Sequence, residues 1–202
     1  MLKIEKSIFL SKPVIGIVGR KIDNIYKVNE NIIKKVIKYD GIPILLLPND
    51  NLNEILNICD GIIMPGGNNI YDYDKYICDY CIKNDIPLLG ICLGMQIMCN
   101  EKLKRIENHQ GVNHKIIIKD NTKLSNIIKN NIVNSRHNEC VIDTSNYIVS
   151  ALSNDGVIEA IEHKTNKFNI GVQWHPEDLD DDLLFFELIK EAKIRNNCNK
   201  SL

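Results

Sequence analysis

The sequence predicts an α/β fold with a doubly wound, mostly parallel central sheet, helices on both faces, and antiparallel additions from the C-terminal half. Over the first two thirds of the 202 residues, apolar strand-like runs alternate with helical patterns. This alternation implies parallel strands joined by right-handed helical crossovers. Shorter strand-like pieces separated by Asn, Asp and Gly follow. No Pro-, Gly- or Ser-rich linker divides the halves, so we expect one domain over residues 1–202.

Four strand-like and three helix-like segments alternate in the first half. The run at 42–48 is continuously apolar, as expected of a parallel strand that is buried on both faces. Asn51 and Glu54 form a candidate capping box for the helix that follows them. The expected strands cover residues 13–19, 42–48, 61–67 and 87–92, and the expected helices cover residues 29–40, 51–59 and 75–85.

The second half contains strand-like pieces and one closing helix. Turn residues separate the pieces, which are expected to extend the same sheet as antiparallel strands. These strands are expected over residues 115–120, 131–135, 147–153, 156–163 and 168–174, and an amphipathic helix over residues 181–194. The acids at 180–182 precede this helix, and the helix dipole explains them more simply than a metal site does.

The composition excludes several classes of protein. The 25 basic and 26 acidic residues give a net charge of -1, so there is no basic excess for a nucleic-acid partner. A hydrophobic fraction of 44% and a charged fraction of 25% exclude a disordered chain. No apolar run reaches membrane-spanning length, and charges interrupt the first ten residues, so neither a membrane partner nor a secretory signal is expected.

Seven cysteines are present, an odd number. Without a secretory signal, the cytoplasm is the expected location, where these residues remain thiols. Cys78 and Cys81 have the spacing of a redox or zinc motif, but they lie in a helical stretch with no second pair. We interpret them as an apolar helix stripe, because a zinc site would need two further ligands. We expect no metal and no cofactor.

One cysteine has a glycine two residues before it and another two residues after it, an arrangement called the glycine frame below. Cys92 is flanked by Gly90 and Gly94, at the point where an apolar strand meets a helical pattern. This pattern is typical of the strained strand-to-helix elbow that presents a nucleophile, where any side chain at the glycine positions would clash. The elbow would place Cys92 at the carboxyl end of the sheet and at a helix N-terminus, which favours a thiolate. For Cys92 considered alone, a small buried apolar residue is the alternative interpretation.

A candidate base follows a later strand. His175 and Glu177 are two residues apart, so on an extended chain they point the same way. Glu177 could then orient His175, which leaves one ring nitrogen to take a proton from Cys92 and return it. His137 is a second histidine after a strand, but we interpret its stretch as positioning backbone groups for substrate. The other histidines, His109, His114 and His163, are expected on the surface or in loops.

Several motifs occur together in order along the chain: PVIGIVG at 13–19, DGIIMPGG at 60–67, PLLGICLGMQ at 87–96, VNSRHNECV at 133–141, DGVIEAIE at 155–162 and GVQWHPED at 171–178. In this order the chain resembles class I glutamine amidotransferases, and within them the γ-glutamyl-γ-aminobutyrate hydrolase branch. Residues 111–114 resemble a substrate-side loop of the family more loosely. The segment 68–85 is shorter than is usual in the hydrolase branch and rich in Tyr and Asp, and it would shape the leaving-group side of the pocket.

The resemblance implies a role for each matching residue. The catalytic triad would be Cys92, His175 and Glu177, and backbone N–H groups at Gly66 or Gly67 and at Leu93 would form the oxyanion hole. The side chains expected to hold the glutamyl group are those of Gln96, Asn134, Ser135, Arg136 and His137.

The implied reaction is cleavage of a γ-glutamyl amide to glutamate and an amine through a glutamyl thioester. The substrate would be a small γ-glutamyl molecule. A glutaminase subunit that delivers ammonia to a separate synthase is the first alternative, and a binding protein that has kept only the fold is the second. The intact Cys92, His175 and Glu177 set argues against the binding protein. A synthase partner and a homodimer both stay open.

Overall fold

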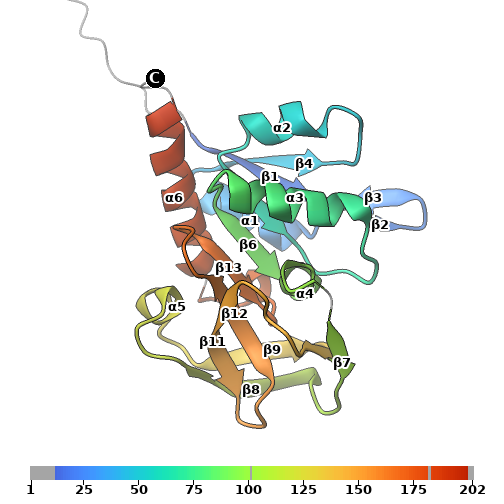
Figure 1. The fold of residues 1–202 in the computed structure, drawn as a ribbon, viewed down its shortest axis with the longest axis vertical. Helices are drawn as coiled ribbons and strands as arrows, with labels where there is room; N and C mark the ends of the chain where they lie inside the picture. The colour runs from blue at the N-terminus through green and yellow to red at the C-terminus, as the bar shows by residue number, and fades with distance from the viewer. Residues whose placement is uncertain (1–11, 101, 182, 200–202) are drawn as a thin grey trace, which may run out of the picture.

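The computed structural model describes residues 12–100, 102–181 and 183–199. At its centre is a nine-stranded sheet with the order β4-β1-β5-β6-β13-β12-β11-β8-β9, and β4 and β9 lie at opposite ends of the molecule (Figure 1). The strands are β1 (Val14–Val18), β4 (Ile42–Leu46), β5 (Gly61–Met64), β6 (Leu88–Ile91), β8 (Gln110–Ile118), β9 (Ile132–Arg136), β11 (Tyr147–Ser153), β12 (Ile158–His163) and β13 (Asn169–Val172).

The sheet has a parallel half and an antiparallel half. Strands β4, β1, β5, β6 and β13 are mutually parallel, and β12, β11, β8 and β9 continue the sheet in antiparallel pairs. This confirms the predicted fold class. One prediction is wrong in part: β13 is antiparallel to β12 but pairs in parallel with β6. It therefore joins the two halves and brings the end of β6 beside its own end.

Helices cover both faces of the sheet. On one face, α1 (Glu30–Lys38), α5 (Lys123–Ile127) and α6 (Leu183–Asn199) pack against apolar side chains of β1, β8 and β13. On the other face, α2 (Leu52–Ile58), α3 (Asp72–Lys83) and α4 (Leu93–Met98) bury a second apolar cluster (Figure 1). The four helices expected from the sequence are therefore confirmed, and α5 is a short addition. Asn29 caps α1 by accepting a hydrogen bond from the backbone N–H of Asn31 at 2.9 Å.

Two local predictions in the first half are wrong. Strand β4 is an edge strand, and Ile42 and Leu45 on it are 43% and 45% exposed, so the strand is not buried on both faces. A continuously apolar run does not distinguish an edge strand from a central one, but Pro43 within it is typical of an edge. Asn51 does precede α2, yet its side chain makes no capping hydrogen bond, so the expected capping box is absent.

Three-residue strands escaped prediction. Strands β2 (Arg20–Ile22) and β3 (Ile25–Lys27) form a hairpin that projects from the molecule (Figure 1). Asp23 and Asn24 at its tip both have positive φ, as a tight two-residue hairpin turn requires. Strands β7 (Leu103–Arg105) and β10 (Glu139–Val141) form a separate antiparallel pair. Segments this short show no measurable periodicity.

Three further predictions concern membrane-spanning helices, the first ten residues and the start of the last helix. No helix within the described residues is long and apolar enough to cross a membrane. The first ten residues, predicted to lack a secretory signal, lie outside the described residues. Before α6, Asp181 Oδ1 lies 3.5 Å from the backbone nitrogen of Leu183, where a carboxylate meets the helix N-terminus.

Candidate active site

Cys92 lies in the sharp turn between β6 and α4. Its backbone has φ 51° and ψ -106°, a conformation that costs a non-glycine residue energy and that clusters at functional sites. The backbone N–H of Cys92 donates to the Val172 carbonyl at 2.8 Å, so pairing with the end of β13 holds the turn in place. The side chain is partly exposed, whereas the strand before it is fully buried. The strained elbow that the sequence predicts is therefore present.

The two flanking glycines leave no room for a side chain. A Cβ atom at Gly94 would lie 2.1 Å from the Met64 carbonyl oxygen, and one at Gly90 would lie 2.4 Å from Met98 Sδ and 2.9 Å from the Gly94 carbonyl carbon. The chain passes this close to β5 because α4 starts directly at the elbow. The glycine frame is thus a packing requirement of the turn, as predicted.

His175 faces Cys92 and is oriented by Glu177. Glu177 lies in the short helix η1 (Pro176–Asp178), and its Oε1 is 2.7 Å from His175 Nδ1. Burial opposes protonation of His175, but the hydrogen bonds that it donates to Cys92 and Glu177, and their negative charges, outweigh burial and raise the pKa of His175 to about 9. His175 is therefore an imidazolium at neutral pH and can donate a proton beside Cys92.

The backbone of His175 is hydrogen-bonded to Asn134, a residue of the edge strand β9. Asn134 Nδ2 donates to the His175 carbonyl at 2.9 Å, and Asn134 Oδ1 accepts from the His175 backbone N–H at 2.8 Å. Both polar groups of the Asn134 side chain are therefore engaged with the base. The sequence suggested a substrate contact for this residue, and the structure places it as a support for His175.

The loop after β5 passes the reacting side chains at close range. A Cβ atom at Gly66 would lie 3.0 Å from His175 Cε1 and 3.4 Å from the Cβ of Cys92. One at Gly67 would lie 3.3 Å from a methyl group of Leu93. Leu93 is the first residue of α4, where a backbone N–H has no partner within the helix. The three predicted oxyanion-hole residues are therefore gathered around Cys92.

A buried arginine holds this loop. Arg20 Nε and Nη2 donate to the Pro65 carbonyl at 3.1 Å and 2.9 Å, and Arg20 Nη1 lies 2.7 Å from Asp74 Oδ1. Both charged side chains are almost completely buried. No sequence pattern indicates this pair, because Arg20 and Asp74 are 54 positions apart and belong to elements that were not expected to meet.

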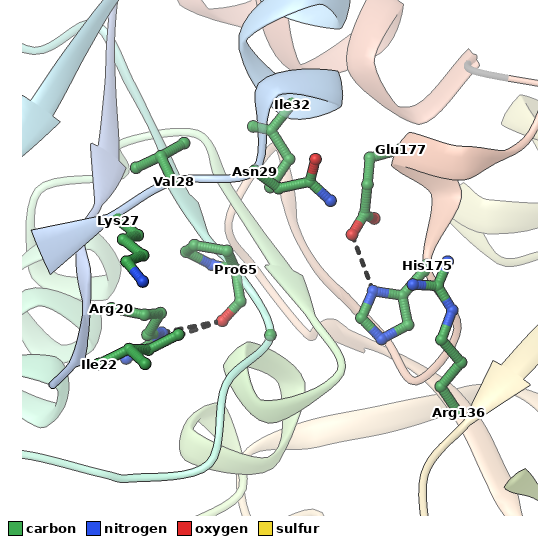
Figure 2. Close-up of a pocket in the computed structure, with 11 residues that line it drawn as sticks. Arg20, Ile22, Lys27, Val28, Asn29, Ile32, Pro65, Arg136, His175 and Glu177 are labelled. Atoms are coloured by element: carbon green, nitrogen blue, oxygen red, sulfur yellow. Dashed lines mark hydrogen bonds and ion pairs between the residues drawn. The ribbon is translucent and has the colours of Figure 1, made fainter.

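An open cleft of about 280 Å³ lies beside His175 (Figure 2). In Figure 2, Arg20, Ile22 and Lys27 from the hairpin lie across the cleft from His175 and Arg136. A second hollow of about 230 Å³ continues past Gly66 and Gly67 to Asn68, Asn69 and Tyr71. The segment expected to shape the leaving-group side therefore does line a hollow next to the elbow.

The other predicted substrate residues fall into two groups. Arg136 lines the cleft and pairs with Asp178. Ser135 and His137 are almost completely buried and do not line the cleft. Ser135 Oγ donates to the His109 carbonyl, and His137 Nδ1 lies 3.0 Å from the Glu139 carbonyl oxygen. Both side chains thus contact backbone carbonyl oxygens inside the protein.

Two glutamines connect Cys92 to the interior. Gln173 Nε2 donates to Cys92 Sγ at 3.6 Å, and Gln96 Nε2 donates to Gln173 Oε1 at 3.2 Å and to the Glu139 carbonyl at 3.3 Å. Gln96 was predicted as a substrate contact, whereas Gln173 was missed. The signal was present: Gln173 lies two positions before His175, so both can point to the same side of an extended chain.

The remaining cysteines are packing residues within the described part of the chain, apart from the exposed Cys198. Cys78 and Cys81 lie on α3 in the apolar cluster, and burial raises the pKa of both thiols. The apolar stripe is therefore confirmed. The histidine prediction is wrong in part: His109 lies in a loop but is buried, whereas the half-buried His114 and the buried His163 lie on β8 and β12. Residues 111–114 belong to β8 and not to a loop.

Comparisons with known proteins agree with this geometry. The family model described as glutamine amidotransferase class-I matches residues 21–182. A glutamine amidotransferase-like protein of Rickettsia prowazekii is 32% identical, with 90% of this chain and 98% of that protein covered. One subunit of the glutamine-hydrolysing GMP synthase of Methanococcus aeolicus is 32% identical, with 72% and 80% covered.

Solved structures share the fold. The glutaminase domain of Trypanosoma brucei CTPS with bound acivicin superposes with a TM-score of 0.73 at 19% identity, covering 89% of this chain and 93% of that one. A GMP synthase subunit of Thermoplasma acidophilum superposes with a TM-score of 0.71 at 18% identity, covering 94% and 96%.

Proposed function

This chain belongs to the class-I glutamine amidotransferase family, and we propose that it is a cysteine-dependent glutaminase that releases ammonia from glutamine for a separate synthase. The observation that carries the proposal is the strained Cys92 facing His175, whose second ring nitrogen lies 2.7 Å from Glu177. The GMP synthase subunit of Methanococcus aeolicus is a glutamine-hydrolysing relative of similar length, which supports this choice of substrate.

The reaction follows from the placement of three side chains. The Cys92 thiolate attacks the γ-carboxamide carbon, and the C=O π electrons move to oxygen to give a tetrahedral intermediate. His175, as imidazolium, gives its proton to the departing nitrogen, so ammonia leaves and a glutamyl thioester remains on Cys92. Neutral His175 then takes a proton from water, which attacks the thioester and releases glutamate. Glu177 keeps the imidazole in one tautomer throughout.

The developing oxyanion needs fixed donors. The backbone N–H groups of Leu93 and of Gly66 or Gly67 are the candidates, because both segments adjoin Cys92. Removal of one such donor costs about 10²–10³ in rate in enzymes where it has been tested. Arg20 acts here as a positioning residue, because it fixes the Pro65 carbonyl directly before Gly66.

Hydrolysis of a larger γ-glutamyl amine is the second candidate. The hollow bounded by Asn68, Asn69 and Tyr71 lies next to Gly67, and the cleft beside His175 is open. Together they offer space for a leaving group larger than ammonia. The basic side chain of Lys27 at the cleft favours an amine that carries a carboxylate, such as γ-aminobutyrate, whereas Arg136 is paired with Asp178.

One assay distinguishes the candidates. The purified chain is incubated with glutamine and with a panel of γ-glutamyl amines, glutamate release is measured, and Cys92→Ser serves as the blank. A kcat/KM for glutamine at least equal to that for every γ-glutamyl amine supports the glutaminase. A γ-glutamyl amine preferred by more than about tenfold supports the second candidate, and release that does not depend on Cys92 contradicts both.

A further inference from the structure

Three of the five histidines of the chain gather around one buried carboxylate, away from the catalytic cleft. Glu159 on β12 is completely buried. Its Oε1 lies 3.4 Å from His109 Nδ1, 3.1 Å from His114 Nε2 and 3.5 Å from His137 Nε2. The side chains of His109 and His137 are almost completely buried, and that of His114 is 18% exposed. Proposed catalysis at Cys92 uses none of these four side chains.

These contacts are short, yet none has hydrogen-bond geometry. All three facing nitrogens and both oxygens of Glu159 are buried without a hydrogen-bond partner. Such groups are costly to bury unless something else compensates them. Ligands of a common metal ion approach each other in this way, because each points at the ion and not at its neighbour. Any two ligands held at about 2.0–2.1 Å from a tetrahedral ion lie about 3.3 Å from one another.

The outer nitrogens of two histidines fix their tautomers. His109 Nε2 lies 3.0 Å from Asp155 Oδ2, a carboxylate oxygen that accepts, so this ring nitrogen donates. His137 Nδ1 lies 3.0 Å from the Glu139 carbonyl oxygen, which can only accept. In the neutral rings, the inner nitrogens therefore direct lone pairs toward Glu159. Converging lone pairs and a carboxylate form a donor set that can bind a cation.

The outer contacts match those of known metal ligands. A metal-binding histidine usually donates its second N–H to a carboxylate or a backbone carbonyl, which orients the ring. His109 meets this condition through Asp155. The inner atoms of His109, His114 and Glu159 all lie within 4.8 Å of one another, so one ion can reach them together.

We propose that His109, His114 and Glu159 form a binding site for a divalent transition-metal ion, with Zn²⁺ as the best match and with His137 beside Glu159. Imidazole nitrogens with one carboxylate suit Zn²⁺, whereas Mg²⁺ and Ca²⁺ prefer oxygen ligands alone. This site would replace the sequence-based expectation that the chain holds no metal. It is independent of the proposed glutaminase activity.

The ion would connect strands β8 and β12, which lie next to residues that contact Cys92. Glu159 accepts the backbone N–H of Gln173 at 2.8 Å through its own carbonyl, and Gln173 reaches Cys92. His137 shares the Glu139 carbonyl with Gln96. Bound metal would therefore link β8 to β12 and act as a structural ion.

Zn²⁺ titration of the metal-free chain tests the site. The background is Cys92→Ser with Cys198→Ser, which removes the two accessible thiols as competing ligands. Calorimetry gives the affinity, and elemental analysis after desalting gives the number of ions. The variants are His114→Gln, on the half-buried ligand, and Glu159→Gln, which preserves side-chain size. His163→Gln is the matched control, because His163 is a buried histidine outside the cluster.

We expect about one Zn²⁺ per chain and a Tm that rises by about 5–10 °C when Zn²⁺ exceeds its Kd a hundredfold. His114→Gln and Glu159→Gln should each weaken binding by at least about tenfold and lose most of this rise, whereas His163→Gln should retain both. If Glu159→Gln does not fold, His114→Gln alone decides. Stoichiometric binding that His114→Gln leaves unchanged, or the absence of binding at micromolar Zn²⁺, overturns the proposal.

Discussion

Gln173 Nε2 lies 3.6 Å from Cys92 Sγ and donates to it, while Gln173 Oε1 accepts from Gln96. The order of the strands creates this relationship. Val172 on β13 is paired in parallel with Ile91 on β6. The residues that follow them, Gln173 and Cys92, therefore lie side by side. The completely buried Gln173 thus gives the sulfur of Cys92 a fixed donor from within the protein.

Replacement of Gln173 by Leu should slow the reaction of Cys92 with electrophiles. A hydrogen bond to a charged group contributes about 1.5–3 kcal/mol, and the long contact to sulfur places this one at the lower end. We expect iodoacetamide to alkylate Cys92 about tenfold more slowly at pH 7, measured by mass spectrometry of the Cys92 peptide. Exposed Cys198 is the internal control and should keep its rate. An unchanged Cys92 rate would show that the donor does not stabilise the thiolate.

Replacement of Glu177 by Gln should shift the alkaline limb of activity. Hydrogen bonding to Cys92 and Glu177 raises the pKa of His175 to about 9 against the cost of burial, and the imidazolium must be present to protonate the leaving group. Wild-type kcat/KM should therefore fall as pH rises through about 9. In Glu177→Gln the limb should move to lower pH, and kcat should drop by about 10²–10⁴. A limb that stays in place would contradict the role assigned to Glu177.

The His175–Glu177 pair should also make the free energy of unfolding depend on pH. The pKa of His175 is higher in the folded chain than the value of about 6.5 in an unfolded one. Its protonation therefore stabilises the fold fully below pH 6.5, and this contribution is lost as pH rises through about 9. The difference in urea midpoint between wild type and Glu177→Gln should be largest near pH 6 and should shrink toward pH 10. A difference that grows with pH would reverse the assigned sign.

Alanine at Gly94 should disrupt the elbow. The new Cβ would lie 2.1 Å from the Met64 carbonyl oxygen, a backbone atom that cannot move without displacing β5. We expect a loss of at least about 3 kcal/mol in the free energy of unfolding, measured with urea. Gly156→Ala is the control: Gly156 has φ +85° and open space around it, so only about 1–2 kcal/mol of backbone strain is expected. Equal losses would contradict the packing argument.

Substitutions in the buried pair of Arg20 and Asp74 should affect stability and activity independently. Arg20→Met leaves the Asp74 carboxylate buried without its cation and should cost about 3–5 kcal/mol. Adding Asp74→Asn should restore most of that stability, because no buried charge remains unpaired. It should not restore kcat, because the Pro65 carbonyl still lacks the two donors that fix the loop before Gly66. Recovery of kcat together with stability would assign Arg20 a purely structural role.

Much of the fold could be predicted because its signals are local. Apolar runs bounded by glycine mark β1, β5 and β6, and the glycine frame around Cys92 follows from a steric requirement that the sequence itself displays. His175 and Glu177 could be paired because their spacing alone brings them together. Each of these features depends on residues that are close in sequence.

The remaining features depend on contacts between distant residues. The edge position of β4 follows from the strand order, which hydrophobicity does not encode. Arg20 meets Asp74 only because the base of the β2–β3 hairpin lies beside the first turn of α3. The cluster around Glu159 joins β8, the turn after β9, and β12, so no spacing of His109, His114 and His137 reveals it. Isolated histidines in polar segments therefore resembled surface residues.

The most direct test of the central claim is capture of the acyl-enzyme on Cys92. The chain is mixed with radiolabelled glutamine, quenched in acid within one turnover, digested and analysed by peptide mapping. We predict label on the peptide that contains Cys92 in the wild type, more label in Glu177→Gln if hydrolysis of the thioester slows most, and none in Cys92→Ser. Glutamate release with no label on Cys92, or release that persists in Cys92→Ser, would contradict the account.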